Sequence, residues 1–331
     1  MHFQIKKEFD YYLYWINERM SIFWRRYEDN PIRIESSKSI FDKQNKKIWS
    51  EDKIFQDYKF TNVYRCLDRV SQFLIKEVIY REKYSEEDII FRILFFKLFN
   101  KIETWKYFED HYERIDLNIL YSKWDEFDAQ VIQLLSQKFP LFSNAYVLST
   151  AVKDEKYHHR KYFLAYKEHI FDKFQDFKKC NSLGELFNKF LSVTYIGNFL
   201  AMQFAIDCNY SEVFNFDENE FIIPGPGAIR GIDRCFSGQK RIQDYVEIIK
   251  WVQENLDSLL EEKGYNVRFL PNRKPTLIDS QNVFCEVSKY LRGVPELNTG
   301  KSGEKRIKQN FKESYNKIEY VFPPKWDIIL K

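Results

Sequence analysis

The sequence predicts a mainly α-helical protein, built as a compact arrangement of many helices. Only ten glycines and nine prolines occur in 331 residues, and no glycine precedes Gly184. Before that glycine the prolines are Pro31 and Pro140. Because glycine and proline form the turns that separate strands, a β-sandwich, a TIM barrel or an N-terminal dinucleotide-binding domain would need far more of them.

Capping residues mark the beginnings of two helices. Ser85, with Asp88 three residues later, predicts a helix over 86–99, whose side chains are apolar on nearly every face, as in a buried helix. Ser182 with Glu185 forms the same pattern and predicts a helix over the apolar positions that follow.

The remaining elements follow from the spacing of apolar residues. An amphipathic run predicts a helix over 62–81, and a further helix is expected over 197–208. The polar stretch 31–47 predicts a long connection. Two short stretches, 221–223 and 266–270, weakly favour strands.

We expect one helical catalytic unit over residues 1–331, because no linker and no internal repeat interrupts the chain. Its first part, about 1–180, lacks glycine and predicts a helical scaffold. The second part, about 181–331, carries the motifs, and six of its glycines fall between Gly184 and Gly238.

Composition excludes several classes of protein. Charged residues make up 31% of the chain, no run of 18 apolar residues occurs, and the N-terminus lacks a signal-peptide core, so a membrane protein is not expected. The cysteines are odd in number and never spaced as C-x-x-C, which favours a reducing cytoplasm over a disulfide framework or a zinc site. The net charge of +3 does not by itself indicate a nucleic-acid partner.

The segment Pro224-Gly225-Pro226-Gly227-Ala228-Ile229-Arg230-Gly231 is the most informative loop. Without a Cβ atom, glycine lets a ligand approach main-chain N–H groups, and a helix starting near Ala228 would direct free amides at a phosphate. Arg230 would add positive charge. The alternative is an ordinary tight turn. Further basic residues follow closely: Arg234, Lys240 and Arg241.

A second polar segment spans 279–290. If it is helical, Asp279 caps it, and Asn282, Glu286 and Lys289 share one face. An amide, a carboxylate and an amine on one face could read a base edge and handle a proton. The alternative is a solvated face that carries a Glu286–Lys289 ion pair.

A third segment spans 60–69. Asn62, Arg65 and Arg69 would share one face of a helix, and Asp68 could pair with Arg65. A face that contacts phosphates and a surface network of ion pairs predict the same pattern, so the residues alone leave both open.

Two other patterns are discounted. Thr299-Gly300-Lys301-Ser302 resembles the end of a P-loop, but Pro295 stands where the leading glycine belongs. The Lys-rich stretch 301–317 better suits a surface that attracts phosphate. His158-His159 has no third ligand at metal spacing, so a solvated pair is expected.

These segments resemble a helical family of phages and bacteria, which comprises α-glutamyl/putrescinyl thymine pyrophosphorylases and the helical domain of 5-hydroxymethyl-deoxyuridine DNA kinases. The resemblance covers about residues 60–290. It rests on the blocks 60–65 with Asp68-Arg69, 95–100 with Thr104-Trp105, 197–200 with Asp207, 225–228 with Arg230-Gly231, and Asp279-x-Gln281-Asn282-x-x-Cys285-Glu286-x-x-Lys289-Tyr290.

The resemblance implies work on hypermodified pyrimidines in double-stranded DNA. Some bacterial members resemble anti-phage glycosylases that excise glucosylated hydroxymethylcytosine and leave abasic sites. The chain shows no fused P-loop kinase domain, so we expect a stand-alone glycosylase of this kind, a hydrolase used in anti-phage defence, which flips the modified pyrimidine out of the duplex. Its helical make-up is also loosely similar to helix-hairpin-helix glycosylases, although 193–197 keeps only one of that hairpin's two glycines.

In this hypothesis a carboxylate stabilises the charge that develops on the sugar and activates water. The expected catalytic residues are Asp279, Glu286 and Asp207. The expected base-binding residues are Asn282, Gln281 and Asn62. The expected DNA- and phosphate-binding residues are Arg65, Arg69, Gly225, Gly227, Arg230 and Lys289, and Lys289 could instead be a covalent nucleophile with lyase activity. No metal or organic cofactor is required, and no obligatory protein partner is inferred.

Two alternatives remain open. A transferase or pyrophosphorylase that builds hypermodified thymine would use the same basic face to bind pyrophosphate. A module without catalytic activity would only recognise modified DNA.

Overall fold

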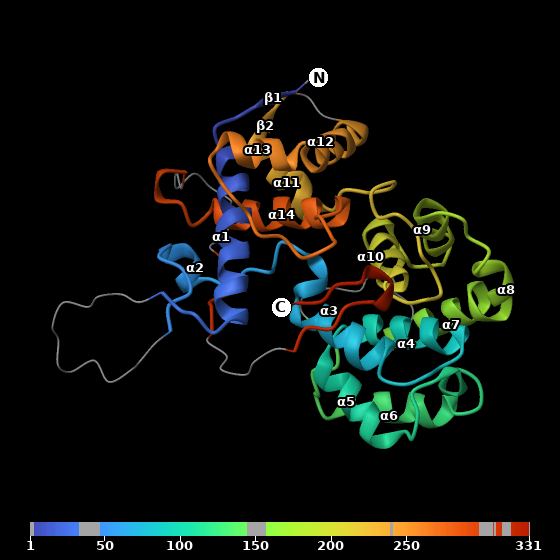
Figure 1. The fold of residues 1–331 in the computed structure, drawn as a ribbon. Coiled ribbons are helices and arrows are strands. Elements are labelled where there is room, and N and C mark those ends of the chain that lie inside the picture. The colour runs from blue at the N-terminus through green and yellow to red at the C-terminus, as the bar shows by residue number, and fades with distance from the viewer. Residues whose placement is uncertain are drawn as a thin grey trace, which may run out of the picture. The chain divides into compact units, whose positions relative to one another are not determined.

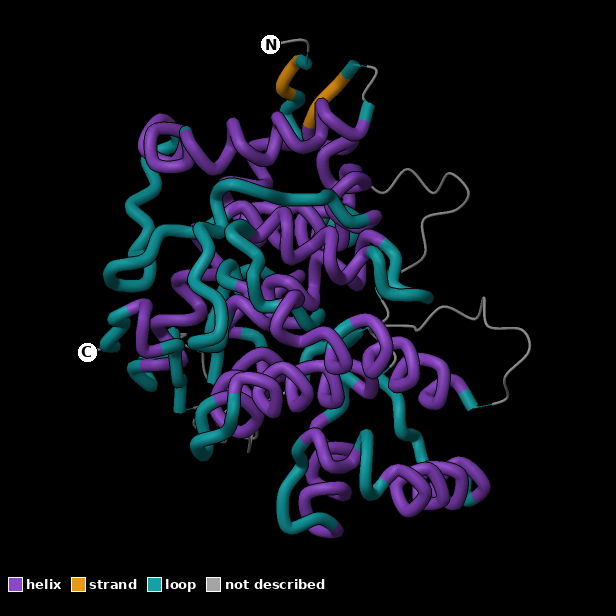
Figure 2. Tube along the Cα trace, turned by 90° about the vertical axis from the view of Figure 1, so that its right-hand side faces the viewer, coloured by secondary structure: helices purple, strands orange, loops and turns teal. Residues whose placement is uncertain are grey.

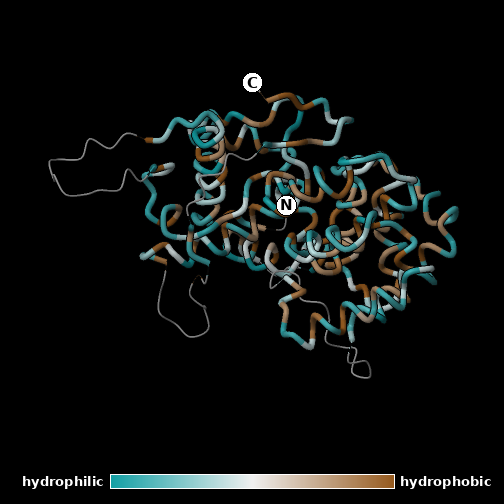
Figure 3. Tube along the Cα trace, turned by 90° about the horizontal axis from the view of Figure 1, so that it is seen from below, coloured by the Kyte–Doolittle hydropathy of each residue, from teal (hydrophilic) through white to brown (hydrophobic). Residues whose placement is uncertain are grey.

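The prediction of a mainly helical protein is confirmed by the computed structural model, which describes residues 3–32, 47–143, 157–238, 241–297, 307, 309–312 and 319–330 (Figure 1). Helices dominate the trace, and the two strands are short (Figure 2). Along the helices, hydrophobic and hydrophilic residues alternate, as expected of helices that bury one face (Figure 3).

The chain divides into two compact units, each assembled from separate stretches of sequence. Unit 1 consists of Met1–Asp68, Pro224–Tyr320 and Ile328–Lys331, and unit 2 of Arg69–Ile223 and Val321–Asp327. These boundaries do not coincide with the division that the sequence suggested near residue 180. That the chain works as one catalytic unit stays a prediction.

Unit 1 is organised around two helices, α1 and α14, which contact each other. The ring of Tyr12 on α1 lies 4.3 Å from that of Phe284 on α14, and Phe9 lies 5.1 Å from Phe236. The elements of this unit are β1 (Gln4–Ile5), α1 (Phe9–Tyr27), α2 (Lys53–Asp57), the 3₁₀ turn Arg65–Leu67, α11 (Pro226–Cys235), β2 (Phe236–Ser237), α12 (Ile242–Glu254), α13 (Leu256–Glu262), α14 (Leu277–Tyr290) and the 3₁₀ turn Pro295–Leu297.

Unit 2 is built around α4, which is buried on nearly every side from Ile90 to Phe99. Its central ring is that of Phe95, which lies 5.5 Å from Phe108 and 5.7 Å from Phe163. The helices of this unit are α3 (Arg69–Phe73), the π-helix Leu74–Ile79, α4 (Glu86–Phe99), α5 (Ile102–His111), α6 (Trp124–Ser136), α7 (His158–His169), α8 (Phe174–Phe177), α9 (Leu183–Leu191) and α10 (Asn198–Asn209). Three 3₁₀ turns complete it: Leu117–Ile119, Phe171–Lys173 and Pro324–Trp326.

The predicted capping signals are confirmed. The Ser85 side chain accepts a hydrogen bond from the Asp88 N–H at the start of α4, and the Ser182 side chain accepts one from the Glu185 N–H at the start of α9. The helix expected over 197–208 is α10. These predictions succeed because a cap acts within one turn of the chain, where sequence spacing determines geometry.

Other expectations need correction. The run 62–81 is not one helix, since it is extended to Tyr64 and then divides into a 3₁₀ turn, α3 and the π-helix. Neither 221–223 nor 266–270 forms a named strand, and Leu270 only bridges to Arg273. The two short strands pair antiparallel between the N-terminus and the end of α11, which local patterns did not indicate. Most of the connection 31–47 and of the stretch 301–317 lies outside the described residues, as does Lys240.

Candidate functional site

The Asp279 carboxylate stabilises the start of α14, but Asp279 is not the N-cap residue. Thr276 is the N-cap, and Asp279 is the third helical residue of a capping box. Asp279 accepts hydrogen bonds from the Thr276 N–H at 3.0 Å and from the Thr276 hydroxyl at 3.2 Å. Its other oxygen accepts one from the Arg65 N–H at 2.7 Å. Asp279 therefore ties the 60–67 segment to α14, and the expectation that it is itself the N-cap is wrong.

Replacing Asp279 with asparagine should lower the free energy of unfolding by about 1–3 kcal/mol, because one acceptor becomes a donor that faces N–H groups. Burial raises the pKa of Asp279 above its ordinary 3.8, and attraction to Arg273 opposes the rise. The folded protein thus binds this proton more tightly than the unfolded chain, so stability from this group falls as pH rises from near 3.8 through the folded-state pKa.

Urea unfolding measured at several pH values tests both parts. Asp279→Asn should remove this component of the pH slope. An unchanged slope in Asp279→Asn would contradict the assignment of the raised pKa to this carboxyl.

About two to three turns further along α14, a carboxylate and an amine share a face, as the spacing predicted. Glu286 Oε2 lies 3.0 Å from Lys289 Nζ and accepts a hydrogen bond from the Thr61 N–H at 2.9 Å. The Lys289 ammonium lies 4.7 Å from the centre of the Phe60 ring. Both side chains are largely buried, at 9% and 14% exposure, so the alternative of a fully solvated ion pair does not hold.

Asn282 joins the same 60–67 segment to the middle of α14. Its Nδ2 donates to the Asn62 carbonyl at 2.8 Å and to the Thr61 hydroxyl at 3.3 Å. Asn62 is only 7% exposed, and its own Nδ2 donates to the Leu67 carbonyl at 3.1 Å. The Asn62 Oδ1 atom is buried and has no hydrogen-bond donor among the described residues.

We call Thr61, Asn62, Asn282, Glu286 and Lys289 the α14 polar cluster. Sequence spacing predicted the common face of Asn282, Glu286 and Lys289. Asn62 was expected to bind the base but was placed on another helix face with Arg65 and Arg69, and Thr61 was missed. Thr276 was missed as well, although the pattern Thr276-x-x-Asp279 was a capping signal. The cluster forms because the Thr61 N–H and the Asn62 carbonyl belong to a non-helical segment, so that polar side chains of α14 form hydrogen bonds with them.

The glycine-rich loop brings α11 against α14, and the expectation that Gly225 and Gly227 bind phosphate stays a prediction. The Gly225 N–H donates to Gln281 Oε1 at 3.1 Å, which engages that amide. A Cβ atom added to Gly227 would lie 2.3 Å from Cys285 Sγ, and one added to Gly231 would lie 2.0 Å from the Phe284 carbonyl oxygen. The missing side chains therefore permit helix packing, and α11 begins at Pro226, two residues before the expected start.

Two predicted site residues belong to unit 2. Asp207 is completely buried on α10 and lies 3.2 Å from Lys97 Nζ of α4. Arg69 is the first residue of α3, whereas Arg65 lies in unit 1 and is 8% exposed. Asn62, Arg65 and Arg69 do not share one helix face. Asn62 lies before the 3₁₀ turn Arg65–Leu67, and Arg69 begins α3.

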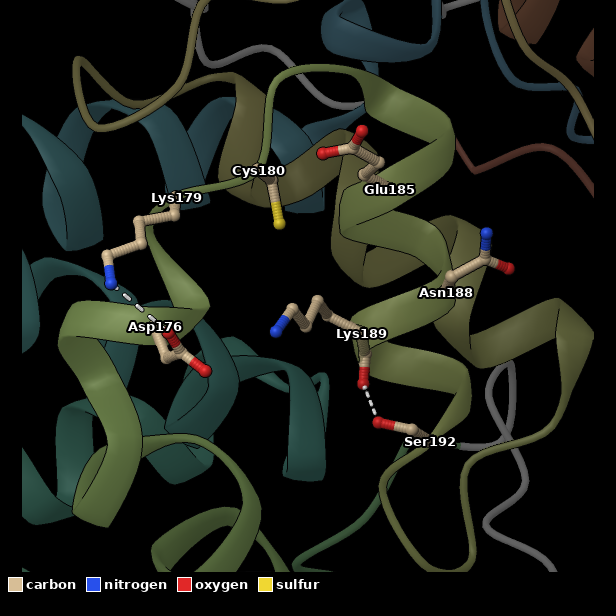
Figure 4. A pocket seen from close by; sticks show the side chains of 7 residues that line it. All are labelled: Asp176, Lys179, Cys180, Glu185, Asn188, Lys189 and Ser192. Carbon is tan, nitrogen blue, oxygen red and sulfur yellow. Dashed lines mark hydrogen bonds and ion pairs between the residues drawn. The ribbon is translucent and has the colours of Figure 1, made fainter.

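Two cavities contain fewer side chains that could take part in a reaction. In unit 2, a cavity of about 450 Å³ is bordered by Cys180 and Lys189, whose side chains point into the same space (Figure 4). Burial raises the pKa of the Cys180 thiol, which disfavours a reactive thiolate. In unit 1, a cavity of about 400 Å³ borders Asp52, whose Oδ2 accepts hydrogen bonds from the Tyr14 hydroxyl at 3.0 Å and the Tyr290 hydroxyl at 2.6 Å.

Among the described residues, no group of three His, Cys, Asp or Glu side chains is arranged to hold a metal ion. His159 is buried rather than solvated as expected, and its Nε2 lies 2.8 Å from Asp128 Oδ1. In the same part of the chain, none of the helices has the length and apolar character needed to span a membrane. The cytoplasmic location stays a prediction.

Comparison with known proteins identifies the family. Residues 6–299 match the family described as the helical domain of 5-hmdU DNA kinase. The chain belongs to this family. A curated relative from Bacillus phage SP10, named 5-hmdU DNA kinase, is 25% identical over an alignment of 304 residues, and the match covers 84% of this chain and 44% of the relative. The chain thus spans less than half the length of that relative. No solved structure matches the chain significantly.

These matches overturn the expected reaction. The named relative is a kinase, so the prediction of a DNA glycosylase, a hydrolase that excises a base, is wrong. The transferase alternative agrees better with the family. The expected roles of Asp279, Glu286 and Asp207 in catalysis are not tested by these matches and stay predictions, as does the role of Lys289 as a nucleophile.

Proposed function

We propose that the chain takes part in a transferase reaction on 5-hydroxymethyl-deoxyuridine in DNA, and that the α14 polar cluster binds the modified base. Family membership and the name of the phage relative support the choice of base and of reaction class. Because the chain spans 44% of that relative, the proposal assigns it recognition of the DNA and leaves the source of the phosphoryl group open.

The observation that most directly supports this proposal is the buried Asn62 Oδ1 atom, which has no hydrogen-bond donor among the described residues. A buried acceptor without a donor costs about 1–3 kcal/mol, and native proteins keep few of them. The hydrogen bond from Asn62 Nδ2 to the Leu67 carbonyl determines which amide atom is the oxygen. A flipped-out pyrimidine could supply the missing donor from its hydroxymethyl O–H or its ring N–H.

The surroundings of Asn62 preorganise this acceptor. Asn282 holds the Asn62 carbonyl, and Glu286 holds the neighbouring Thr61 N–H, so the segment is fixed from α14 at two points. A site whose residues are held by a second set of hydrogen bonds loses less entropy on binding. Glu286 and Lys289 are the candidate groups for the proton of the hydroxymethyl oxygen, since they lie on the same helix face.

Binding to matched duplexes tests the proposal. Three duplexes of one sequence should carry a single 5-hydroxymethyluracil, thymine or uracil, and affinity should be measured by fluorescence anisotropy. We expect the hydroxymethyl duplex to bind at least about 5-fold tighter, which corresponds to about 1 kcal/mol for one hydrogen bond. Asn62→Ala should remove this preference and retain affinity for the other two duplexes. The exposed Asn198→Ala is the matched control.

Two outcomes are decisive for the proposal. Equal affinity of the unaltered protein for all three duplexes would overturn it. A preference that survives Asn62→Ala in folded protein would move the base site away from the α14 polar cluster. Incubation with γ-labelled ATP and the hydroxymethyl duplex then shows whether this chain transfers phosphate itself or only binds the DNA.

A further inference from the structure

A charged side chain lies on the buried face of α1. Arg19 follows Ile16 by three residues and precedes Phe23 by four, so the three residues share one face of the helix. Ile16 and Phe23 are only 1% and 2% exposed, whereas Arg19 is half-buried. An arginine at such a position costs free energy unless its N–H donors find acceptors, so the contacts of its guanidinium group are informative.

The guanidinium group of Arg19 contacts the segment that carries the proposed base site. Its Nε donates to the Thr61 carbonyl at 2.6 Å. The Thr61 N–H donates to Glu286 Oε2 at 2.9 Å, so Thr61 is hydrogen-bonded to both α1 and α14. The Thr61 carbonyl also belongs to the peptide unit that joins Thr61 to Asn62. Arg19 therefore lies next to the α14 polar cluster, within unit 1.

One nitrogen of this guanidinium group has no acceptor. Arg19 Nη1 is buried and forms no hydrogen bond among the described residues. Burial lowers the pKa of Arg19 to about 10, so the group still carries its charge near neutral pH. A buried, charged donor without an acceptor is costly, and native proteins keep few such groups.

Two buried polar atoms without partners are thus attached to one peptide unit, and they are complementary. Arg19 Nη1 is a donor held at the Thr61 carbonyl, and Asn62 Oδ1 is an acceptor on the next residue. In 5-hydroxymethyluracil, the hydroxymethyl O–H is a donor and the O4 carbonyl is an acceptor, and they stand on neighbouring ring carbons. One donor and one acceptor from the protein fit this edge of the base.

We propose that Arg19 is a specificity-determining residue, whose Nη1 donates a hydrogen bond to the O4 carbonyl of the flipped-out base while Asn62 Oδ1 accepts one from the hydroxymethyl O–H. The inference rests on the proposed function. Cytosine carries an amino group in place of O4, and its N–H donors would face the donors of the guanidinium group. Arg19 therefore discriminates against hydroxymethylated cytosine, whereas Asn62 selects the hydroxymethyl group.

A carbonyl oxygen suits this position better than a phosphate group. Arginine–phosphate pairs are frequently bidentate and use two parallel N–H donors. Arg19 Nε is already bonded to the Thr61 carbonyl, and the cation of the α14 polar cluster, Lys289, is paired with Glu286 at 3.0 Å. The buried Nη1 matches a single oxygen atom.

Four duplexes of one sequence test the assignment. They carry a single 5-hydroxymethyluracil, 5-hydroxymethylcytosine, thymine or 5-methylcytosine, each opposite an abasic site, so that the strength of the base pair does not contribute. Fluorescence anisotropy should show that the unaltered protein favours 5-hydroxymethyluracil over 5-hydroxymethylcytosine, and thymine over 5-methylcytosine. Each preference should be at least about 10-fold, as expected for one hydrogen bond to a charged group.

Arg19→Met removes the donors and keeps a long side chain. It should abolish both preferences for the carbonyl and retain the preference for 5-hydroxymethyluracil over thymine. Arg25→Met is the matched control, because Arg25 also lies on α1 and donates to a main-chain carbonyl, that of Trp49, at 2.9 Å. Circular dichroism confirms folding, and Arg19→Lys, which retains the charge, serves if Arg19→Met does not fold.

Three results would overturn the inference. The unaltered protein would bind the two members of each pair equally, which needs no variant. A folded Arg19→Met would keep both preferences. Alternatively, it would weaken binding of all four duplexes by the same factor, which is the effect expected if Arg19 only holds the Thr61 carbonyl.

Failure of the proposed function gives a different pattern. If 5-hydroxymethyluracil and thymine bind equally, but thymine exceeds 5-methylcytosine and loses this advantage in Arg19→Met, the hydroxymethyl assignment is wrong and the contact of Arg19 with O4 stands. If 5-hydroxymethyluracil exceeds thymine but binds no better than 5-hydroxymethylcytosine, the proposed function stands and the role of Arg19 is wrong.

Discussion

Replacing Lys97 with methionine is expected to lower the free energy of unfolding of unit 2 by about 3–5 kcal/mol. Lys97 Nζ lies 3.2 Å from Asp207 Oδ2, with only 4% and 0% of the two side chains exposed. The substitution removes the cation that lies against this buried carboxylate, and removing one partner of a buried ion pair is far more costly than loss of a surface pair. Urea unfolding followed by circular dichroism measures the effect.

The double variant separates charge burial from packing. Lys97→Met combined with Asp207→Leu removes both charges at similar volume, so it should be much more stable than Lys97→Met alone. Lys178→Met is the matched surface control, because Lys178 is 36% exposed beside Glu86, and its expected cost is below about 1 kcal/mol. A double variant as unstable as the single one would show that the two side chains act through other contacts.

Replacing Gly231 with alanine should destabilise unit 1 by about 1–3 kcal/mol, although alanine is the better helix former. The added Cβ would lie 2.0 Å from the Phe284 carbonyl oxygen, which is main chain and cannot move without displacing α14. Gly227→Ala should be similarly costly, because its Cβ would lie 2.3 Å from Cys285 Sγ. Thermal unfolding measures both losses.

A double-mutant cycle distinguishes the two contacts. Cys285→Ala removes the sulfur atom that opposes Gly227→Ala, so the pair should recover most of the lost stability. The same Cys285→Ala should not rescue Gly231→Ala, whose obstacle is a backbone oxygen. Equal rescue at both positions, or none at either, would contradict the close packing of α11 on α14.

The family was accessible from sequence, but the reaction was not. The blocks around Asn62, Gly225 and Glu286 indicated the family that the matches then established. The prediction of a glycosylase relied on finding no P-loop kinase domain among these residues, and that observation does not determine the chemistry of the residues that are present. The buried Asn62 acceptor, which has no donor among the described residues, is a property of the folded chain, and a linear pattern does not reveal it.

The sequence by itself determined what depends on neighbours within a few residues. Scarce glycine argued against a β-sandwich, a TIM barrel and an N-terminal dinucleotide-binding domain. The capping pairs at Ser85 and Ser182 located the starts of α4 and α9, because a helix begins through contacts within one turn. The common face of Asn282, Glu286 and Lys289 followed from the pitch of a helix.

Only the tertiary structure decided what those faces meet. The segment before the 3₁₀ turn Arg65–Leu67 packs against α14 without being helical. Asp279 is not the N-cap of α14, and its side chain accepts a hydrogen bond from the Arg65 N–H. In the structure Asp207 forms a buried ion pair with Lys97 in unit 2, and Gly227 and Gly231 allow α11 to pack closely on α14. These outcomes depend on residues more than 50 positions apart, whose contacts arise from burial of the whole core and not from local spacing.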